Sequence, residues 1–324
     1  MTNYKITILK RITSSFLCIT LFFSCEEPQD TSPPSLEIIS HISNQTVSGI
    51  STIVVISEDN KNVEKVEFQI NNQGVFNDYE SPYKYDWNTE LLENLSEHIL
   101  QVTSYDESGN FTKSNAMTLI VDNRVIIWGQ YFDINSTSIL NLESFRINSG
   151  EVLPAPIPSE IGDLVNLKFL NLSLNKLNEA IPIELFNLSS LEELYLNDNY
   201  LSGSLSTDIQ HLVQLNTLSL TDNEISGNIP SEIGYLNKLE KIFLYNNQFS
   251  GVIPEEIGNL INLNELRLQN NSLGGFIPET ICNLNQEIFY NVLGETNFSN
   301  NKLCPPYPSC VEDFVGVQDT SNCN

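Results

Sequence analysis

The feature that most constrains the fold of this 324-residue chain is a 24-residue spacing that continues without a gap. Leucine recurs every 24 residues from Leu167 to Leu263, and asparagine does so from Asn175 to Asn271. Between them, each repeat carries two apolar residues one position apart, as in LYL at 194–196. A spacing kept over five repeats predicts a stack of similar coils, each burying its apolar side against the next.

Each repeated position has a physical reason. The two apolar residues are expected on a short strand, pointing into the core, so that successive coils build one parallel sheet. The asparagine side chain is expected to turn inward after the strand and satisfy backbone groups of neighbouring coils. These predicted ladder positions are Asn175, Asn199, Asn223, Asn247 and Asn271.

The full pattern, L-x-x-L-x-L-x-x-N-x-L followed by G-x-I-P-x-x-I-G-x-L, is clear in SGNIPSEIGYL at 226–236. It resembles the plant-type leucine-rich repeat, which also occurs in exported bacterial proteins. The resemblance implies a solenoid with a parallel concave sheet over residues 164–303. An N-terminal cap with the first half-repeat is expected over 124–163, and a Cys-containing C-terminal cap over 304–324.

Residues 36–123 follow another pattern, with short alternating runs such as VEKVEFQI and EHILQVTSY between turn-rich segments. Several short strands at this spacing predict an antiparallel β-sandwich with Trp87 in its core. The segments PPSLEIIS, SPYKYDWNT and YDESGN resemble bacterial immunoglobulin-like domains, which mostly act as spacers. The predicted fold class is therefore mainly β: an immunoglobulin-like sandwich followed by a leucine-rich-repeat solenoid.

Three polar residues of the predicted sandwich, Asp59, Asp106 and Asn110, fall in turns where related domains sometimes hold calcium. Asp and Asn are also ordinary turn formers. Because that role accounts for them, the sequence assigns no metal site and no cofactor.

The N-terminus has the pattern of an export signal. Residues 1–24 combine a basic start with an apolar core that is too short to span a bilayer, and Ser24 precedes Cys25. This resembles a bacterial lipoprotein signal, although Phe22 replaces the usual aliphatic residue. The resemblance implies cleavage before Cys25, lipidation of that residue and anchoring at the outer membrane or cell surface. The alternative is an ordinary cleaved signal. Residues 25–35 are expected to form an acidic tether.

Four further cysteines lie near the C-terminus, and their even number in an exported chain predicts two disulfides. They are Cys282, Cys304, Cys310 and Cys323. The segment CPPYPSC resembles the short closure that ends many plant-type arrays, which implies Cys304–Cys310 with Cys282–Cys323. Pairing in chain order, Cys282–Cys304 with Cys310–Cys323, remains the competing possibility.

Charge and motifs exclude several functions. The formal net charge is −26, and loss of the first 24 residues, which carry three basic and no acidic residues, makes it −29. Such a field repels phosphate backbones, so no nucleic-acid partner is expected. The three histidines, His41, His98 and His211, have no partners at metal-ligand or catalytic spacing. No hydrolase, protease or nucleotide-binding motif is present, which predicts that the protein is not an enzyme.

A binding surface is predicted on the outward positions of the repeat strands. Reading across coils, Tyr195, Phe243 and Tyr245 lie near two cations, Lys241 and Arg267. Aromatic residues and arginine are common anchors of interfaces, although scattered surface aromatics are also normal. These five residues are the predicted ligand-binding set.

The favoured function is a surface-anchored recognition or adhesion protein that binds a protein or glycan partner through the concave face. One alternative is a carbohydrate-capturing lipoprotein that works with a nutrient-uptake system. The other is a structural, self-associating envelope protein.

Overall fold

The computed structural model describes residues 29–145, 153, 156–284 and 296–323. The predicted signal, Cys25 and the first residues of the predicted tether lie outside this range. Secondary structure in the described residues consists of β-strands and 3-10 helices. No helix among them has the length and apolar character needed to cross a membrane. The chain divides into two compact units, one built mainly from the N-terminal strands and one containing the repeats.

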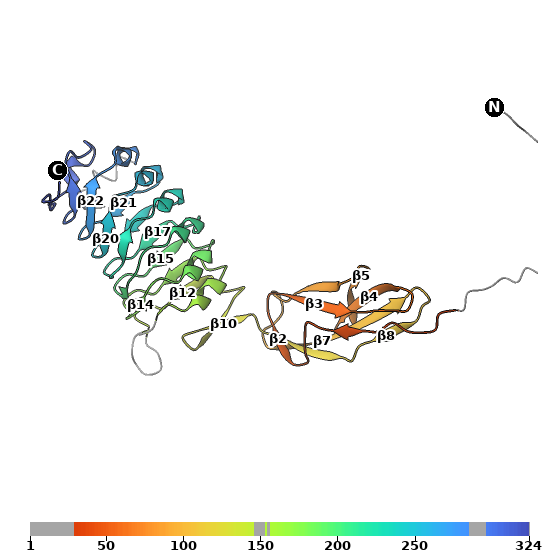
Figure 1. Cartoon of the computed structure of the whole chain (residues 1–324). Helices are drawn as coiled ribbons and strands as arrows, with labels where there is room; N and C mark the ends of the chain where they lie inside the picture. The colour runs from red at the N-terminus through yellow and green to blue at the C-terminus, as the bar shows by residue number, and fades with distance from the viewer. Residues whose placement is uncertain (1–28, 146–152, 154–155, 285–295, 324) are drawn as a thin grey trace, which may run out of the picture. The chain divides into compact units, whose positions relative to one another are not determined.

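The N-terminal strands form two sheets (Figure 1). One has the order β1-β3-β6, and the other has the order β2-β9-β7-β4-β5, with β8 paired to β7. The strands are β1 (Glu37–Ile38), β2 (Gln45–Val47), β3 (Ile50–Ile56), β4 (Val63–Ile70), β5 (Gln73–Asp78), β6 (Tyr83–Asn88), β7 (Ser96–Asp106), β8 (Phe111–Lys113) and β9 (Met117–Val121).

The core of the sandwich follows the alternation of its strands. In β4, Val66 and Phe68 are fully buried while Glu67 between them is partly exposed. Trp87 is 5% exposed, as predicted, and its ring meets His98 edge-on with 5.4 Å between ring centroids. One face of each strand therefore supplies the apolar layer, which is the arrangement that period-two alternation favours.

The repeats form a seven-stranded parallel sheet in which every strand pairs with the next in sequence order. We call the outward-pointing side of this sheet the concave face (Figure 1). Its strands are β12 (Ile139–Asn141), β13 (Phe169–Asn171), β15 (Glu193–Tyr195), β17 (Thr217–Ser219), β19 (Lys241–Phe243), β21 (Glu265–Arg267) and β23 (Thr296–Asn297).

The remainder of each coil contains a shorter strand and a 3-10 helix. A hairpin, β10 (Arg124–Ile127) with β11 (Gln130–Asp133), precedes the first coil. The shorter strands are β14 (Asn178–Glu179), β16 (Tyr200–Leu201), β18 (Ser226–Asn228), β20 (Gln248–Gly251), β22 (Ser272–Phe276) and β24 (Lys302–Cys304). The helices are η1 (Ser159–Asp163), η2 (Ile183–Asn187), η3 (Thr207–His211), η4 (Ser231–Tyr235), η5 (Glu255–Asn259), η6 (Glu279–Asn283) and η7 (Glu312–Phe314).

The sequence explains where the helices begin. η1, η2, η4, η5 and η6 each follow a proline, whose fixed φ suits the residue that leads into a helix. η3 follows Ser206 instead, and the Ser206 side chain accepts a hydrogen bond from the Asp208 N–H at 3.1 Å. A serine cap therefore replaces proline in that coil.

The predicted asparagine positions make one repeated set of hydrogen bonds. The Asn223 amide nitrogen donates to the carbonyls of Leu196, Leu220 and Thr221 at 3.0–3.1 Å. Its side-chain oxygen accepts from the Leu201 N–H at 2.9 Å. Asn175, Asn199, Asn247 and Asn271 repeat this pattern. The inward leucines are fully buried around them, so a continuous core runs through the stack.

The ladder continues beyond the five predicted positions. Asn301 donates to the Leu268 and Phe298 carbonyls, both at 3.0 Å. Gln318 then does the same in the C-terminal cap, donating to Phe298 and Val315 and accepting from the Leu303 N–H. Gln318 lies only 17 residues after Asn301, so the regular 24-residue spacing does not reveal it.

Both disulfide pairings considered from the sequence are wrong. The structure joins Cys282 to Cys310 and Cys304 to Cys323, with Cα atoms 5.7 and 5.5 Å apart. The reason is that the cap adds another coil corner: the Val311 N–H bonds the Pro308 carbonyl at 3.0 Å, just as Ile281 bonds Pro278. The Cys282–Cys310 bridge joins this corner to η6.

Candidate concave binding face

The parallel register brings the predicted binding residues onto one face. Tyr195, Ser219, Phe243 and Arg267 are direct partners on four successive strands and form a single column. Lys241 belongs to the neighbouring column, two residues before Phe243, and it is exposed. Tyr245 lies two residues after Phe243, where its carbonyl accepts from the Asp222 N–H at 3.2 Å. The concave face therefore carries all five predicted residues.

The first group on this face is built by Tyr195 and Phe169, whose ring centroids are 5.7 Å apart. The Tyr195 hydroxyl donates to the Glu193 carboxylate at 2.7 Å. Partial burial, followed by this hydrogen bond and the charge of Glu193, raises the pKa of Tyr195 to about 12. The phenol therefore stays protonated in the physiological range, and its ring is held in a fixed position.

The second group is built by Phe243 and Arg267, with the guanidinium carbon 5.7 Å from the ring centroid. Arg267 Nη2 also lies 2.6 Å from Glu265 Oε1, and the two side chains are 32% and 13% exposed. Arg267 is therefore an oriented, neutralised cation rather than an isolated positive charge. Its Nε is buried and has no hydrogen-bond partner among the described residues.

Between the two groups lies β17, which presents small polar side chains. Thr217, Ser219 and Thr221 are only 6%, 6% and 4% exposed. They alternate with fully buried Leu218 and Leu220 and therefore point away from the core. This row lies between the two groups on the same face, and we call it the β17 row.

Two hollows on the array were not predicted from the sequence. One, of about 510 Å³, is lined by residues of β12, β13 and β15, including Ile139 and Phe169. The other, of about 450 Å³, is lined by the polar residues just before the strands, including Asn216 and Lys238. Neither lining includes Tyr195, Phe243, Tyr245 or Arg267. Ile139 is 67% exposed, and an apolar residue on an outward strand position is unusual. Ile139 could therefore have indicated the first of these hollows from the sequence.

A second row of side chains on the array bonds internally. Asp222 accepts from Asn246, Asn246 from Asn270, and Asn270 from Asn300, at 2.5–2.7 Å. All four residues have positive φ, which Asn and Asp tolerate better than other residues do. This row therefore stabilises the turns after the strands, and its polar groups are already engaged with one another.

Family comparisons match both parts of the chain. The model described as "Bacterial Ig domain" matches residues 34–104. The model described as "Leucine Rich Repeat" matches residues 190–212, 214–236, 238–260 and 262–284. The comparison with curated proteins returned no match.

Similar solved structures are plant receptor ectodomains. The plant peptide hormone receptor RGFR1 in complex with RGF2 is 35% identical with a TM-score of 0.48, covering 56% of this chain and 28% of the receptor chain. The Arabidopsis receptor kinase HAESA, in complex with the peptide hormone IDA and the co-receptor SERK1, is 34% identical with a TM-score of 0.44, covering 50% and 26%. The BIR2 ectodomain from Arabidopsis thaliana is 32% identical with a TM-score of 0.37, covering 43% and 71%.

The matched part of this chain thus spans about a quarter of the first two receptor chains. The two matched family models account for separate stretches of the sequence. Both stretches have the architecture that their models describe, a sandwich of two sheets and a stack of parallel coils. The chain therefore combines a bacterial immunoglobulin-like domain with a leucine-rich-repeat domain.

Proposed function

We propose that this protein is an exported, lipid-anchored recognition protein that binds a partner polypeptide through the concave face. The observation that carries the proposal is the β17 row with the Tyr195–Phe169 group on one side and the Phe243–Arg267 group on the other. Fixed aromatic rings beside an oriented arginine are typical of interface anchors. A rigid sheet that presents them lowers the entropic cost of binding.

The dimensions and charge of the face favour a polypeptide. β15 and β19 are separated by one strand, so the two groups are roughly 10 Å apart, about the width of an extended chain with its side chains. The Thr217 and Ser219 hydroxyls donate to Asn216 and Asn197 at 2.9 and 3.2 Å, and their oxygens remain able to accept from a backbone N–H. Because the chain carries a net charge of −26, a partner with basic residues is attracted at long range.

A glycan is the second candidate, and the hydroxyl groups of the β17 row are the observation that favours it. Thr217 and Ser219 lie between aromatic rings that can stack on sugar faces. A glycan ligand would fit a carbohydrate-capturing role, and it would be held by stacking and hydroxyl contacts more than by charge.

The test is a combined array of surface proteins and glycans, probed with the labelled protein. We expect retention by protein features, with the signal reduced at least tenfold in a Tyr195→Ala/Phe243→Ala double variant. Tyr235→Ala is the matched control, because Tyr235 is an exposed tyrosine on η4, away from the sheet. Retention by glycans alone would favour the second candidate. An undiminished signal in the double variant would contradict the concave face as the binding surface.

Export and anchoring are supported by the N-terminal sequence and by the two disulfides, which persist in oxidising compartments. A fatty-acid probe supplied to growing cells should label the wild type and not Cys25→Ala. Cys18→Ala, which alters the other N-terminal cysteine, should remain labelled. Labelling of Cys25→Ala would show that the anchor is elsewhere.

A further inference from the structure

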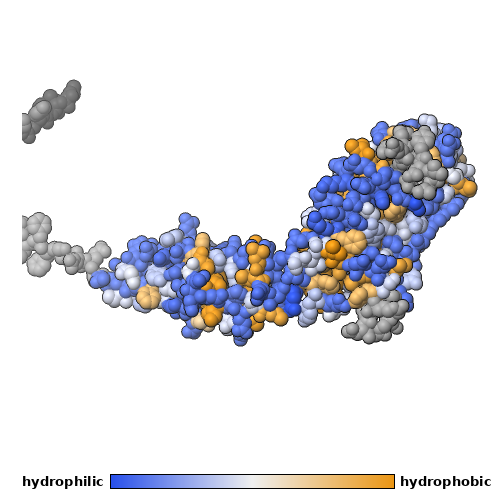
Figure 2. Space-filling view, turned by 180° about the vertical axis from the view of Figure 1, so that it is seen from behind, coloured by the Kyte–Doolittle hydropathy of each residue, from blue (hydrophilic) through white to orange (hydrophobic). Residues whose placement is uncertain are grey.

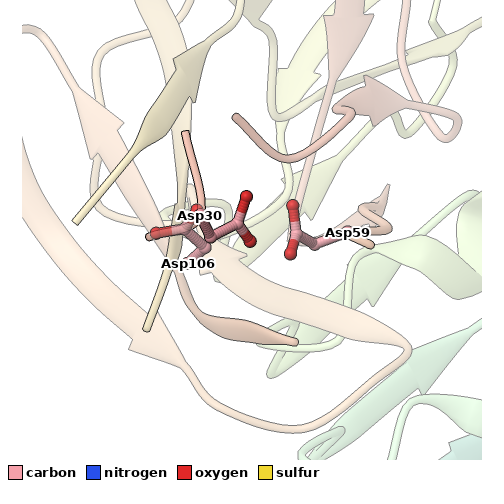
Figure 3. Close-up of side chains that lie close together, drawn as sticks. All are labelled: Asp30, Asp59 and Asp106. Carbon is pink, nitrogen blue, oxygen red and sulfur yellow. The ribbon is translucent and has the colours of Figure 1, made fainter. Parts of the chain in front are cut away.

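Three aspartates from separate segments meet at one end of the sandwich. Asp30 precedes β1, Asp59 lies in the turn between β3 and β4, and Asp106 ends β7. One carboxylate oxygen from each lies within 4.8 Å of the other two. Figure 3 shows Asp59 facing Asp30 and Asp106.

Two of these carboxylates contain an oxygen without a partner. Asp30 is 7% exposed, and its Oδ2 has no hydrogen-bond partner among the described residues; the same holds for Asp59 Oδ1. The ion pairs within the described residues involve none of the three aspartates. Burying a carboxylate oxygen without a partner costs free energy unless a cation or a hydrogen-bond donor contacts it.

Asp106 is held in place by its own turn. Its Oδ1 accepts from the Ser108 and Asn110 N–H groups at 2.9 and 2.8 Å, and its Oδ2 accepts from the Asn110 amide nitrogen at 2.7 Å. The Asn110 amide nitrogen also donates to the Asp30 carbonyl at 3.1 Å. Asn110 therefore positions Asp30 and Asp106 by donating hydrogen bonds to them with its amide nitrogen.

Asp30 reaches this place because residues 30–35 pack on the domain, although the sequence assigned them to the tether. The Ser35 N–H bonds the Glu58 carbonyl at 2.7 Å, and the Ser57 hydroxyl bonds the Ser35 carbonyl at 2.6 Å. Within the segment, Asp30 Oδ1 accepts from the Ser32 N–H at 3.0 Å. Oδ1 is therefore engaged, and Oδ2 remains without a hydrogen-bond partner among the described residues.

From this geometry we propose that Asp30, Asp59 and Asp106 bind one calcium ion, which joins the segment before β1 to two turns of the immunoglobulin-like domain. Calcium takes oxygen ligands at about 2.3–2.6 Å, so two ligands of one ion lie at most roughly 5 Å apart. The 4.8 Å limit on the three oxygens meets this requirement. The ligands come from three distant parts of the sequence, which is why local spacing does not reveal the site.

The test is calorimetric titration of the EDTA-treated, dialysed protein with calcium chloride. We expect one ion per chain, with a Kd on the order of 10⁻⁴–10⁻³ M, the range of extracellular calcium modules. Asp30→Asn should weaken calcium binding at least tenfold, and so should Asp59→Asn. Glu58→Gln removes the same charge from an exposed neighbour and should leave the Kd within twofold.

Circular dichroism of each variant checks that the strands are retained, and magnesium chloride provides a second titration. Magnesium should bind at least tenfold more weakly, because it requires shorter bonds in a stricter geometry. Absence of calcium binding up to 10 mM (roughly ten times the upper expected Kd), equal affinity in Asp30→Asn, or equal affinity for magnesium would each overturn the proposal.

Discussion

In the repeats, the ladder asparagines hydrogen-bond the backbone, whereas the inward leucines form the core. Each ladder asparagine satisfies carbonyls in its own coil and in the preceding coil, so adjacent coils share its amide group. Asn223, for instance, bonds Leu196 in one coil and Leu220 in the next. No apolar residue can replace this function, because the carbonyls lie away from water and would lose their donor.

Substitutions in the middle coil test this division of roles. Leu220 is fully buried, so Leu220→Ala should lower the free energy of unfolding by about 2–5 kcal/mol. Asn223→Ala should lower it by about 1–3 kcal/mol, because backbone groups lose their partner. Urea denaturation measures both, with Val213→Ala, 48% exposed, as a control expected within about 0.5 kcal/mol. Unchanged urea midpoints in both core variants would contradict the register.

At this scale the sequence predicted most of the array. The period identified which leucines and asparagines point inward, because a 24-residue step returns each position to the same place in the coil. It did not identify the second row from Asp222 to Asn300, because the period alone does not show which side chains bond to one another. Their side-chain bonds and positive φ depend on the turn that follows each strand.

At the scale of the elements, successive 3-10 helices pack closely against one another at the positions that glycine occupies. A Cβ built on Gly234 of η4 would lie 2.5 Å from both the carbonyl oxygen and the Cβ of Glu256 in η5. Gly162 and Gly258 approach the next coil in the same way, to 2.4 and 2.2 Å from a carbonyl oxygen. Glycine at these positions therefore permits close stacking of one coil on another.

Gly234→Ala should destabilise the array by about 1–3 kcal/mol, because η4 and η5 must separate to admit the methyl group. Gly274→Ala is the matched control, since a Cβ there would meet its nearest neighbour at an ordinary 3.5 Å. Thermal unfolding of both variants checks the difference. Equal melting temperatures for the two would show that the coils are not packed this tightly.

The strand β5, which was not predicted from the sequence, lacks a periodic hydrophobic pattern. In β5 the residues are nearly all exposed, so no alternation marks it as a strand, yet it pairs with β4 along five residue pairs. Disulfide pairing was missed for another reason. It depends on how the cap coil stacks on η6, and the spacing of the cysteines along the chain does not contain that information.

In the proposed function, the two domains of the molecule have different roles: the immunoglobulin-like domain supports the repeats, and the repeats supply the binding face. Figure 2 shows hydrophobic groups on both domains with hydrophilic surface between them. A strongly acidic surface favours solubility, and we propose that recognition is confined to particular places such as the β17 row.

The most direct test of binding at the concave face is to locate the bound partner on the molecule. Amide hydrogen exchange should be measured on the protein with and without a partner protein retained on the array. We expect slower exchange at 193–197, 217–221, 241–245 and 265–269, because these segments carry the two side-chain groups and the β17 row. The segments that contain η4 and η5 should exchange equally in both samples. Protection confined to the immunoglobulin-like domain or to the 3-10 helices would contradict binding at the concave face.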